Sequence, residues 1–257
     1  MPDKIFYGWR LCATGFCFAV FGLGGVVLGF VFFPLLNLFV RNRERRIVLA
    51  RSTVRLGFRF FVGLMHHLAV LRYEVVGRER LNRHGLLVLA NHPSLIDTVF
   101  LMALIDHADC ILKAPLQRNV FTRGAARAAN YIFNDQGMAL IDACAESLQH
   151  GSNLIVFPEG TRTPADGSIV LKRGAANIAV RARRNITPVL ISCEPRTLGK
   201  GDKWWLIPAR MARFTIRVGE DVDISRFGNE SPGDAIAARR LTDFLQNYFT
   251  EEVQRHA

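Results

Sequence analysis

Two short polar stretches of the sequence combine residue types that could carry out acid–base chemistry. In the first, NHPSLID, Asn91 and His92 precede Asp97 by a few positions. Histidine is an effective general base because its side chain titrates at about 6.5. A carboxylate on one ring nitrogen orients the ring and leaves the other nitrogen free to accept a proton. The spacing predicts that Asp97 folds back to orient His92, although Ser94 capping a helix in an ordinary loop would need the same residues.

The second stretch, FPEGTR, places polar groups on a turn. Gly160 forms the turn, and Glu159, Thr161 and Arg162 project from it. The planar fork of an arginine suits a phosphate or carboxylate, and the backbone amides beside Gly160 could add to an anion site. A surface ion pair between Glu159 and Arg162 is the alternative reading of this turn.

The elements around these stretches predict an α/β fold. Short apolar, β-rich runs stand at 73–77, 86–90, 110–113, 131–133, 154–157, 186–192 and 214–219. Helical patterns lie near 95–106, 115–128, 137–149 and 172–184, with a final helix at about 232–252. Continuous apolar strands that alternate with helices indicate a mostly parallel central sheet flanked by helices. His92 and Glu159 each follow such a strand, so we expect the two stretches to meet at one edge of the sheet.

The N-terminal part of the chain predicts a membrane-embedded helical segment. Residues 11–40 carry no formal charge, and a spanning helix needs only about 20 apolar residues. The run is longer than the ~7–15 apolar residues of a signal peptide. Its glycines and Pro34 leave a tilted span, a kinked helix or a re-entrant hairpin open. An amphipathic helix at about 47–71 follows, so residues 1–70 are predicted to form a membrane-associated region and residues 71–257 the catalytic domain.

The charge and the cysteine content limit which binding partners we expect. The net charge is +11, from 33 Lys and Arg against 22 Asp and Glu, which fits either a nucleic acid or an anionic membrane surface. The apolar N-terminus favours the membrane, and we expect no nucleic-acid partner. Basic residues flank the apolar run, so we expect residues 71–257 on the cytoplasmic side of the membrane. The membrane we expect is a bacterial inner membrane. The five cysteines show no zinc-ligand spacing, so we expect no metal.

Together, NHxxxxD and FPEGTR resemble the motifs of the lysophospholipid acyltransferase family, which is typified by 1-acylglycerol-3-phosphate acyltransferases. The segment ILKAPL, with Lys113, is similar to the family's Lys-x-x-Leu segment, and ITPVLI at 186–191 is similar to its fourth block. The resemblance runs from about 86 to 195. It implies a glycerolipid acyltransferase-like fold for the catalytic domain.

The resemblance also implies a reaction. An acyl group would pass from the thioester of acyl-CoA or acyl carrier protein to the hydroxyl of a lysophospholipid, in the first place 1-acylglycerol-3-phosphate. His92 would be the general base and Asp97 its orienting carboxylate, with no cofactor besides the acyl donor. The residues implied to bind substrate are Asn91, Lys113, Glu159, Gly160, Thr161 and Arg162.

One position departs from the family pattern. The family's second block usually ends in an arginine that helps to hold the acceptor phosphate, whereas this chain has Gln136 there. Glutamine can donate hydrogen bonds to a phosphate but brings no charge. A different hydroxylated lipid, such as an ornithine-type, glycine-type or polyene lipid, therefore stays open as the acceptor. A non-catalytic membrane lipid-binding protein is the further alternative, and the sequence leaves the oligomeric state open.

Overall fold

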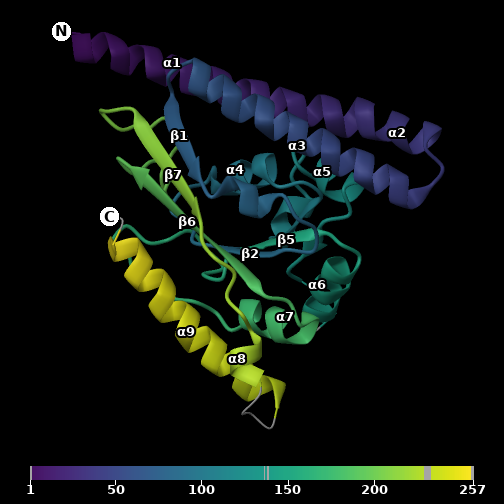
Figure 1. Cartoon of the computed structure of the whole chain (residues 1–257). Coiled ribbons are helices and arrows are strands. Elements are labelled where there is room, and N and C mark those ends of the chain that lie inside the picture. Colours follow the sequence, from purple (N-terminus) through teal and green to yellow (C-terminus); the bar gives the residue numbers. More distant parts are fainter. Residues whose placement is uncertain (1, 136, 138, 229–232, 256–257) are drawn as a thin grey trace.

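A computed structural model describes residues 2–135, 137, 139–228 and 233–255 (Figure 1). Its centre is a seven-stranded sheet in the order β1-β7-β6-β2-β5-β3-β4. The strands are β1 (Leu71–Val76), β2 (Leu87–Ala90), β3 (Ala108–Leu112), β4 (Ile132–Phe133), β5 (Asn153–Val156), β6 (Ile186–Glu194) and β7 (Ala212–Val218). Neighbouring strands are parallel except for β6 and β7, which pair antiparallel. The predicted α/β class and mostly parallel sheet are confirmed, and each predicted strand coincides with an observed one.

Both faces of the sheet are covered, which explains why its central strands are apolar throughout. On β2, Leu87 and Leu89 point into one core cluster, whereas Val88 and Ala90 point into the other. Successive side chains of a strand point to opposite faces, so all four become buried. One face packs against α6 (Ala139–Gln149), α7 (Gly174–Ala182) and α9 (Asp234–Arg255). The other packs against α4 (Asp97–Leu104), α5 (Arg123–Ala128) and the N-terminal helices. A short helix, α8 (Ser225–Gly228), precedes α9.

The helix predicted at 115–128 is wrong as a single element. The chain forms a 3₁₀ turn at Ala114–Gln117, which Pro115 opens, and α5 begins only at Arg123. Between them the Asn119 side chain accepts a hydrogen bond from the Phe121 N–H at 2.9 Å. A side-chain acceptor of this kind offers the backbone an alternative to helical bonding, so the segment breaks there.

The apolar N-terminal segment is one continuous helix, and the chain reverses direction only after it, at Val40, before the next helix begins. It comprises α1 (Pro2–Val27), a π-helical turn at Leu28–Phe32 and α2 (Phe33–Phe39). Pro34 is tolerated because the π turn precedes it and it stands in the first turn of α2. Residues Phe6–Phe39 are long and apolar enough to cross a membrane by length and composition.

The predicted amphipathic helix is α3 (Arg43–His67), which packs against α1. It begins and ends four residues before the predicted 47–71. Together α1, α2 and α3 form a helical hairpin along one side of the molecule (Figure 1).

This hairpin is docked tightly on the domain that carries the sheet. A Cβ on Gly25 would lie 2.4 Å from the Phe121 carbonyl oxygen, so only glycine permits this approach of α1. On α3, Arg51 forms a buried ion pair with Asp109 of β3 at 2.7 Å. Its guanidinium also donates to the Ala129 carbonyl at 3.0 Å. Residues of the hairpin and of the sheet therefore share one hydrophobic core.

Candidate active site

The two polar stretches meet because the strands that carry them are neighbours. β2 pairs parallel with β5, with Leu89 opposite Val156, so both chains leave the sheet at the same edge. The loop after β2 and the turn after β5 then bond to each other, since the Thr163 N–H donates to the His92 carbonyl at 2.7 Å. The expectation that the two stretches meet at one edge of the sheet is thus confirmed.

His92 is held from its edge and from its face. Its Nδ1 lies 2.9 Å from Asp97 Oδ2, and its ring stacks on Phe157 with 4.2 Å between the ring centroids. The Ser94 N–H also donates to Asp97 Oδ2, at 2.6 Å. The His92 side chain is 15% exposed, whereas Asp97 is fully buried at the start of α4. When the carboxylate accepts the Nδ1–H, the lone pair lies on Nε2, which is the arrangement a general base requires.

Burial dominates the electrostatics of the two site carboxyls. It raises the pKa of Asp97, and the hydrogen bonds from His92 and Ser94, together with the charge of Arg162, oppose that rise. Burial likewise raises the pKa of Glu159, against the hydrogen bonds that its carboxylate accepts. The charged form of each carboxyl therefore depends on the donors arranged around it.

Glu159 and Asn91 both form hydrogen bonds within the protein, and the substrate contacts predicted for them stay predictions. Glu159 Oε1 accepts from the His92 N–H and from the Thr163 hydroxyl, both at 2.9 Å. The buried amide of Asn91 donates to the Ile191 carbonyl at 2.9 Å and accepts from the Ile191 N–H at 2.7 Å. Asn91 thus ties the loop after β2 to β6, and Glu159 ties the same loop to the FPEGTR turn. These hydrogen bonds hold the backbone around His92 in place.

The glycine of the turn has a left-handed backbone conformation, and the ammonium group of Lys172 lies against it. Gly160 has φ +68°, the left-handed region that favours glycine. A Cβ at this position would lie 3.0 Å from Lys172 Nζ, so the lysine ammonium rests directly against the turn. Lys172 comes from the segment before α7, and only its positive charge in the sequence pointed to it.

Arg162 is anchored through one end of its guanidinium. Its Nη1 donates to the carbonyls of Leu198 and Gly199, at 2.9 and 2.6 Å. The Leu198 carbonyl also accepts a hydrogen bond from the Leu95 N–H, with 3.0 Å between nitrogen and oxygen. The side chain is half-buried, so this loop fixes the direction of the fork beside the Asp97–His92 pair.

The remaining predicted residues lie farther from this cluster. Thr161 is half-buried on the turn, and Lys113 is exposed just after β3, at the same edge of the sheet. In the residues that the structure describes, no hydrogen bond or ion pair joins the Lys113 side chain to His92 or Glu159. Gln136, the departure from the family pattern, lies outside the described residues.

Three parts of the site went unnoticed in the sequence. They are the Thr163 hydroxyl, the Phe157 ring and the loop at 197–199. Phe157 is the first residue of the FPEGTR stretch and could have been suspected from that position. The loop at 197–199 gives no local signal, because its role depends on its place beside two distant segments.

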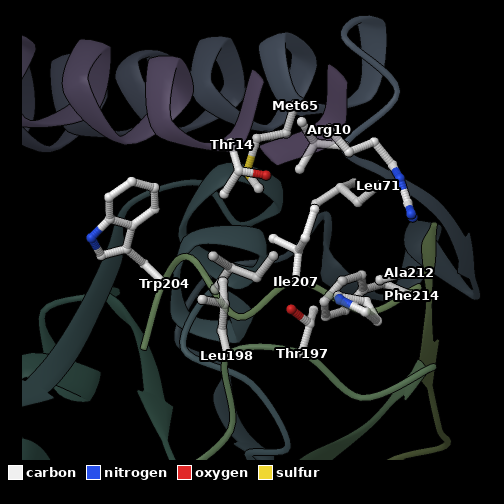
Figure 2. A pocket seen from close by; sticks show the side chains of 13 residues that line it. Arg10, Thr14, Met65, Leu71, Thr197, Leu198, Trp204, Ile207, Ala212 and Phe214 are labelled. Atoms are coloured by element: carbon white, nitrogen blue, oxygen red, sulfur yellow. The ribbon is translucent and has the colours of Figure 1, made fainter. Parts of the chain in front are cut away.

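A small apolar cavity lies behind the catalytic loop, between that loop and α1 (Figure 2). Its lining includes Thr14 of α1, Ile96, Leu198 and Trp204. The volume of ≈ 20 Å³ is room for about one water molecule, so in this conformation it is not an open acyl-chain channel. Among the described residues, no group of three or more His, Cys, Asp or Glu side chains is arranged to hold a metal ion.

Comparison with known proteins shows which family this chain is similar to. The family called Acyltransferase matches residues 72–192, which include both motifs. Residues 72–192 are therefore similar to the members of this family. This stretch carries the His92–Asp97 pair and the whole FPEGTR turn.

Individual relatives agree with this similarity. A Caenorhabditis elegans protein whose name, 1-acyl-sn-glycerol-3-phosphate acyltransferase acl-2, is provisional shares 39% identity over 127 residues, 46% of this chain and 45% of that protein. The 1-acyl-sn-glycerol-3-phosphate acyltransferase of Pseudomonas aeruginosa shares 29% over 145 residues, 54% of this chain and 56% of that enzyme. The chain thus spans about half the length of these relatives.

The fold extends the likeness to the whole molecule. The crystal structure of the 1-acyl-sn-glycerophosphate acyltransferase PlsC from Thermotoga maritima superposes with a TM-score of 0.71 at 24% identity. The superposition covers 98% of each chain. The N-terminal hairpin and the C-terminal helix are therefore part of a shared architecture.

Proposed function

We propose that this protein is a membrane-associated O-acyltransferase that moves an acyl group from a thioester to the hydroxyl of a lysophospholipid. The observation that carries the proposal is the His92–Asp97 hydrogen bond beside the FPEGTR turn, within the stretch that is similar to the acyltransferase family. The first acceptor we propose is 1-acylglycerol-3-phosphate, because proteins named for that reaction are among the relatives.

The chemistry follows from the free nitrogen of His92. Nε2 removes the proton from the acceptor hydroxyl as the oxygen attacks the thioester carbonyl, since an alcohol is a weak nucleophile at neutral pH. Asp97 stabilises the imidazolium that forms. The tetrahedral intermediate expels the thiolate, which recovers the proton from the imidazolium, so the enzyme returns to its starting state. The bond formed is the ester and the bond broken is the carbon–sulfur bond of the donor.

Cations at the turn suit a phosphate on the acceptor. Lys172 lies against Gly160, and Arg162 is half-buried beside the Asp97–His92 pair. Two positive side chains beside one turn favour a phosphate monoester, which carries close to two negative charges at neutral pH. Lys172 supplies a charge that Gln136 lacks, so we keep 1-acylglycerol-3-phosphate ahead of the uncharged and zwitterionic acceptor lipids.

The proposal also covers the acyl donor and the location of the protein in the cell. Acyl-CoA and acyl carrier protein are both anionic, and a chain with a net charge of +11 suits either. The hairpin of α1, α2 and α3 would hold the domain at the membrane, where the acceptor resides. We place the protein in a bacterial inner membrane with the catalytic domain on the cytoplasmic side.

A substrate panel tests the proposal. Purified protein in detergent receives a labelled acyl thioester, on CoA or on acyl carrier protein, and one acceptor at a time. The acceptors are 1-acylglycerol-3-phosphate, other lysophospholipids, and ornithine- and glycine-type lipids. Mass spectrometry identifies the product. We expect diacylglycerol 3-phosphate to form fastest. Faster acylation of an ornithine- or glycine-type lipid would show that this lipid, and not 1-acylglycerol-3-phosphate, is the acceptor. Lipid binding without thioester consumption would refute the enzymatic function.

A further inference from the structure

A second charged region lies at the turn of the N-terminal hairpin. A pocket of ≈ 500 Å³ opens between α2, the start of α3 and α5. Four arginines line it: Arg43 and Arg46 of α3, and Arg123 and Arg127 of α5. None of the residues assigned above to the acyl-transfer site lines it. Its volume falls within the range of about 300–1,000 Å³ that is typical of small-ligand pockets.

The positive charge of this pocket is not neutralised by the protein. In the part of the chain that the structure describes, none of the four arginines forms an ion pair with a carboxylate. Glu44 lies next to Arg43 in the sequence, and its carboxylate joins none of them within the same described residues. The Arg123 guanidinium instead lies over the Phe30 ring, 5.3 Å from its centroid. Like charges gathered on two helices favour an anion from outside the chain.

Apolar side chains line the pocket beside the arginines, and this apolar surface continues onto an exposed face of α2. Phe30, Phe33 and Pro34 line the pocket beside the arginines. Beyond them, Leu38 and Phe39 of α2 are 70% and 77% exposed. A free inorganic anion would use the arginines and leave this apolar surface bare. An amphiphile would cover both, with its charged head among the guanidiniums and its chains along α2.

We infer that this pocket binds the phosphodiester head of an anionic two-chain phospholipid, separately from the acyl-transfer site. Arginine matches a phosphate bidentately, so the four side chains can hold one phosphate from two helices. Because α3 and α5 contribute two arginines each, the bound lipid would also fasten the hairpin to the catalytic domain. The lipid here is a ligand that stays intact, in contrast to the acceptor that is acylated.

The test compares two variants that lose the same charge. Arg46→Gln/Arg123→Gln removes the two half-buried arginines of the pocket. Arg41→Gln/Arg45→Gln is the matched control, because both residues are exposed at the same turn and neither lines the pocket. Full-length protein in a zwitterionic detergent is titrated by calorimetry with short-chain phosphatidylglycerol, short-chain phosphatidylcholine and inorganic phosphate. Circular dichroism and melting curves check that each variant is folded.

We expect the wild type to bind phosphatidylglycerol more tightly than phosphatidylcholine or inorganic phosphate. The pocket variant should bind phosphatidylglycerol at least about tenfold more weakly, since hydrogen bonds to a charged group contribute on this scale, and the control should bind as the wild type does. Equal losses in both variants would mean a diffuse surface charge and would overturn the inference. Equal affinity for inorganic phosphate, or for phosphatidylcholine, would overturn the assignment to an anionic lipid.

The acyl-transfer rate separates this inference from the proposed function. The initial rate of the pocket variant with its acceptor and thioester should stay within a few-fold of the wild type. Lost lipid binding with retained turnover supports a separate site. An equal loss of lipid binding and of turnover would show that the pocket belongs to the reaction and would overturn the separation.

Discussion

Asp97→Asn is the substitution that separates the chemical role of Asp97 from its structural role. Asparagine has nearly the same shape and keeps an oxygen that can accept the Ser94 N–H, but it carries no charge to stabilise an imidazolium. The hydrogen bond at stake, 2.9 Å from His92 Nδ1 to Asp97 Oδ2, is charge-assisted once His92 holds the proton. Such a bond contributes about 1.5–3 kcal/mol, which corresponds to a rate loss of about 10- to 150-fold. A flipped amide that donates to Nδ1 would hold the wrong tautomer and deepen the loss toward about 10⁴-fold.

The assay is turnover as a function of pH, with thioester consumption as the readout. In the variant, kcat should fall across the pH range, because the imidazolium that forms during the reaction loses its stabilising carboxylate. KM for the acceptor should change little, since Asp97 is fully buried and does not reach the substrate. A wild-type kcat across the pH range would refute the orienting role of Asp97.

Stability gives an independent reading of the same substitution. Burial raises the pKa of Asp97, so the folded protein holds this proton more tightly than the unfolded chain. The stability contributed by protonation is therefore complete below the unfolded value of about 3.9 and is lost as pH rises through the raised folded value. Asparagine does not titrate there, so in urea denaturation the free energy of unfolding of the variant should rise relative to that of the wild type as the pH rises above about 4. A constant or shrinking difference would contradict the raised pKa.

Substitutions at Glu159, Gly160 and Arg51 test which contacts stabilise the site and the docking of the hairpin. Glu159→Ala should lower the free energy of unfolding by about 1–3 kcal/mol in urea, because two donors lose their acceptor, whereas Glu159→Gln should retain most of it; equal losses would contradict this. Gly160→Ala should lower the unfolding free energy by about 1–2 kcal/mol, since its φ of +68° penalises a Cβ, and an unchanged melting temperature would refute that. Arg51→Ala should destabilise by about 3–5 kcal/mol because it leaves the Asp109 carboxylate buried and unpaired. Arg51→Met/Asp109→Leu should recover much of that loss, and a double variant no better than the single one would argue against the buried charge as the cause.

The sheet and the meeting of the two motifs were predictable because both follow from local pattern. Apolar strands buried on two faces mark themselves in the sequence, as Leu87 to Ala90 do. Once β2 and β5 are parallel neighbours, His92 and Glu159 must leave the sheet at one edge. The distance from His92 to Asp97 then follows from a short strand-to-helix turn.

The orientation of the supporting side chains was not predictable in the same way. The sequence shows that Glu159 and Asn91 are polar, but not that each faces inward onto backbone groups of another segment. Those partners come from β6 and from the loop after β2, and tertiary packing alone sets their positions. The same holds for Arg162, whose anchor is a pair of carbonyls in the loop at 197–199.

The path of the N-terminal hairpin was also not predictable from the sequence alone. The apolar composition of residues 11–40 predicted a membrane segment but left its path open, since Pro34 and the glycines permit several. Contact with the catalytic domain decides the path, because Gly25 lets α1 approach the Phe121 backbone closely. The domain boundary near residue 70 stays a prediction, although Cys17 and Val88 lie in one hydrophobic cluster.

The most direct test of the account is the turnover of His92→Gln with 1-acylglycerol-3-phosphate and a labelled acyl thioester. Glutamine can keep a hydrogen bond to Asp97 but cannot accept the acceptor's proton, and His84→Gln serves as a control away from the site. We predict that His92→Gln loses at least about 10²-fold in kcat with an unchanged melting temperature, while the control keeps wild-type turnover. Wild-type turnover in a folded His92→Gln protein would contradict the assignment of His92 as the general base.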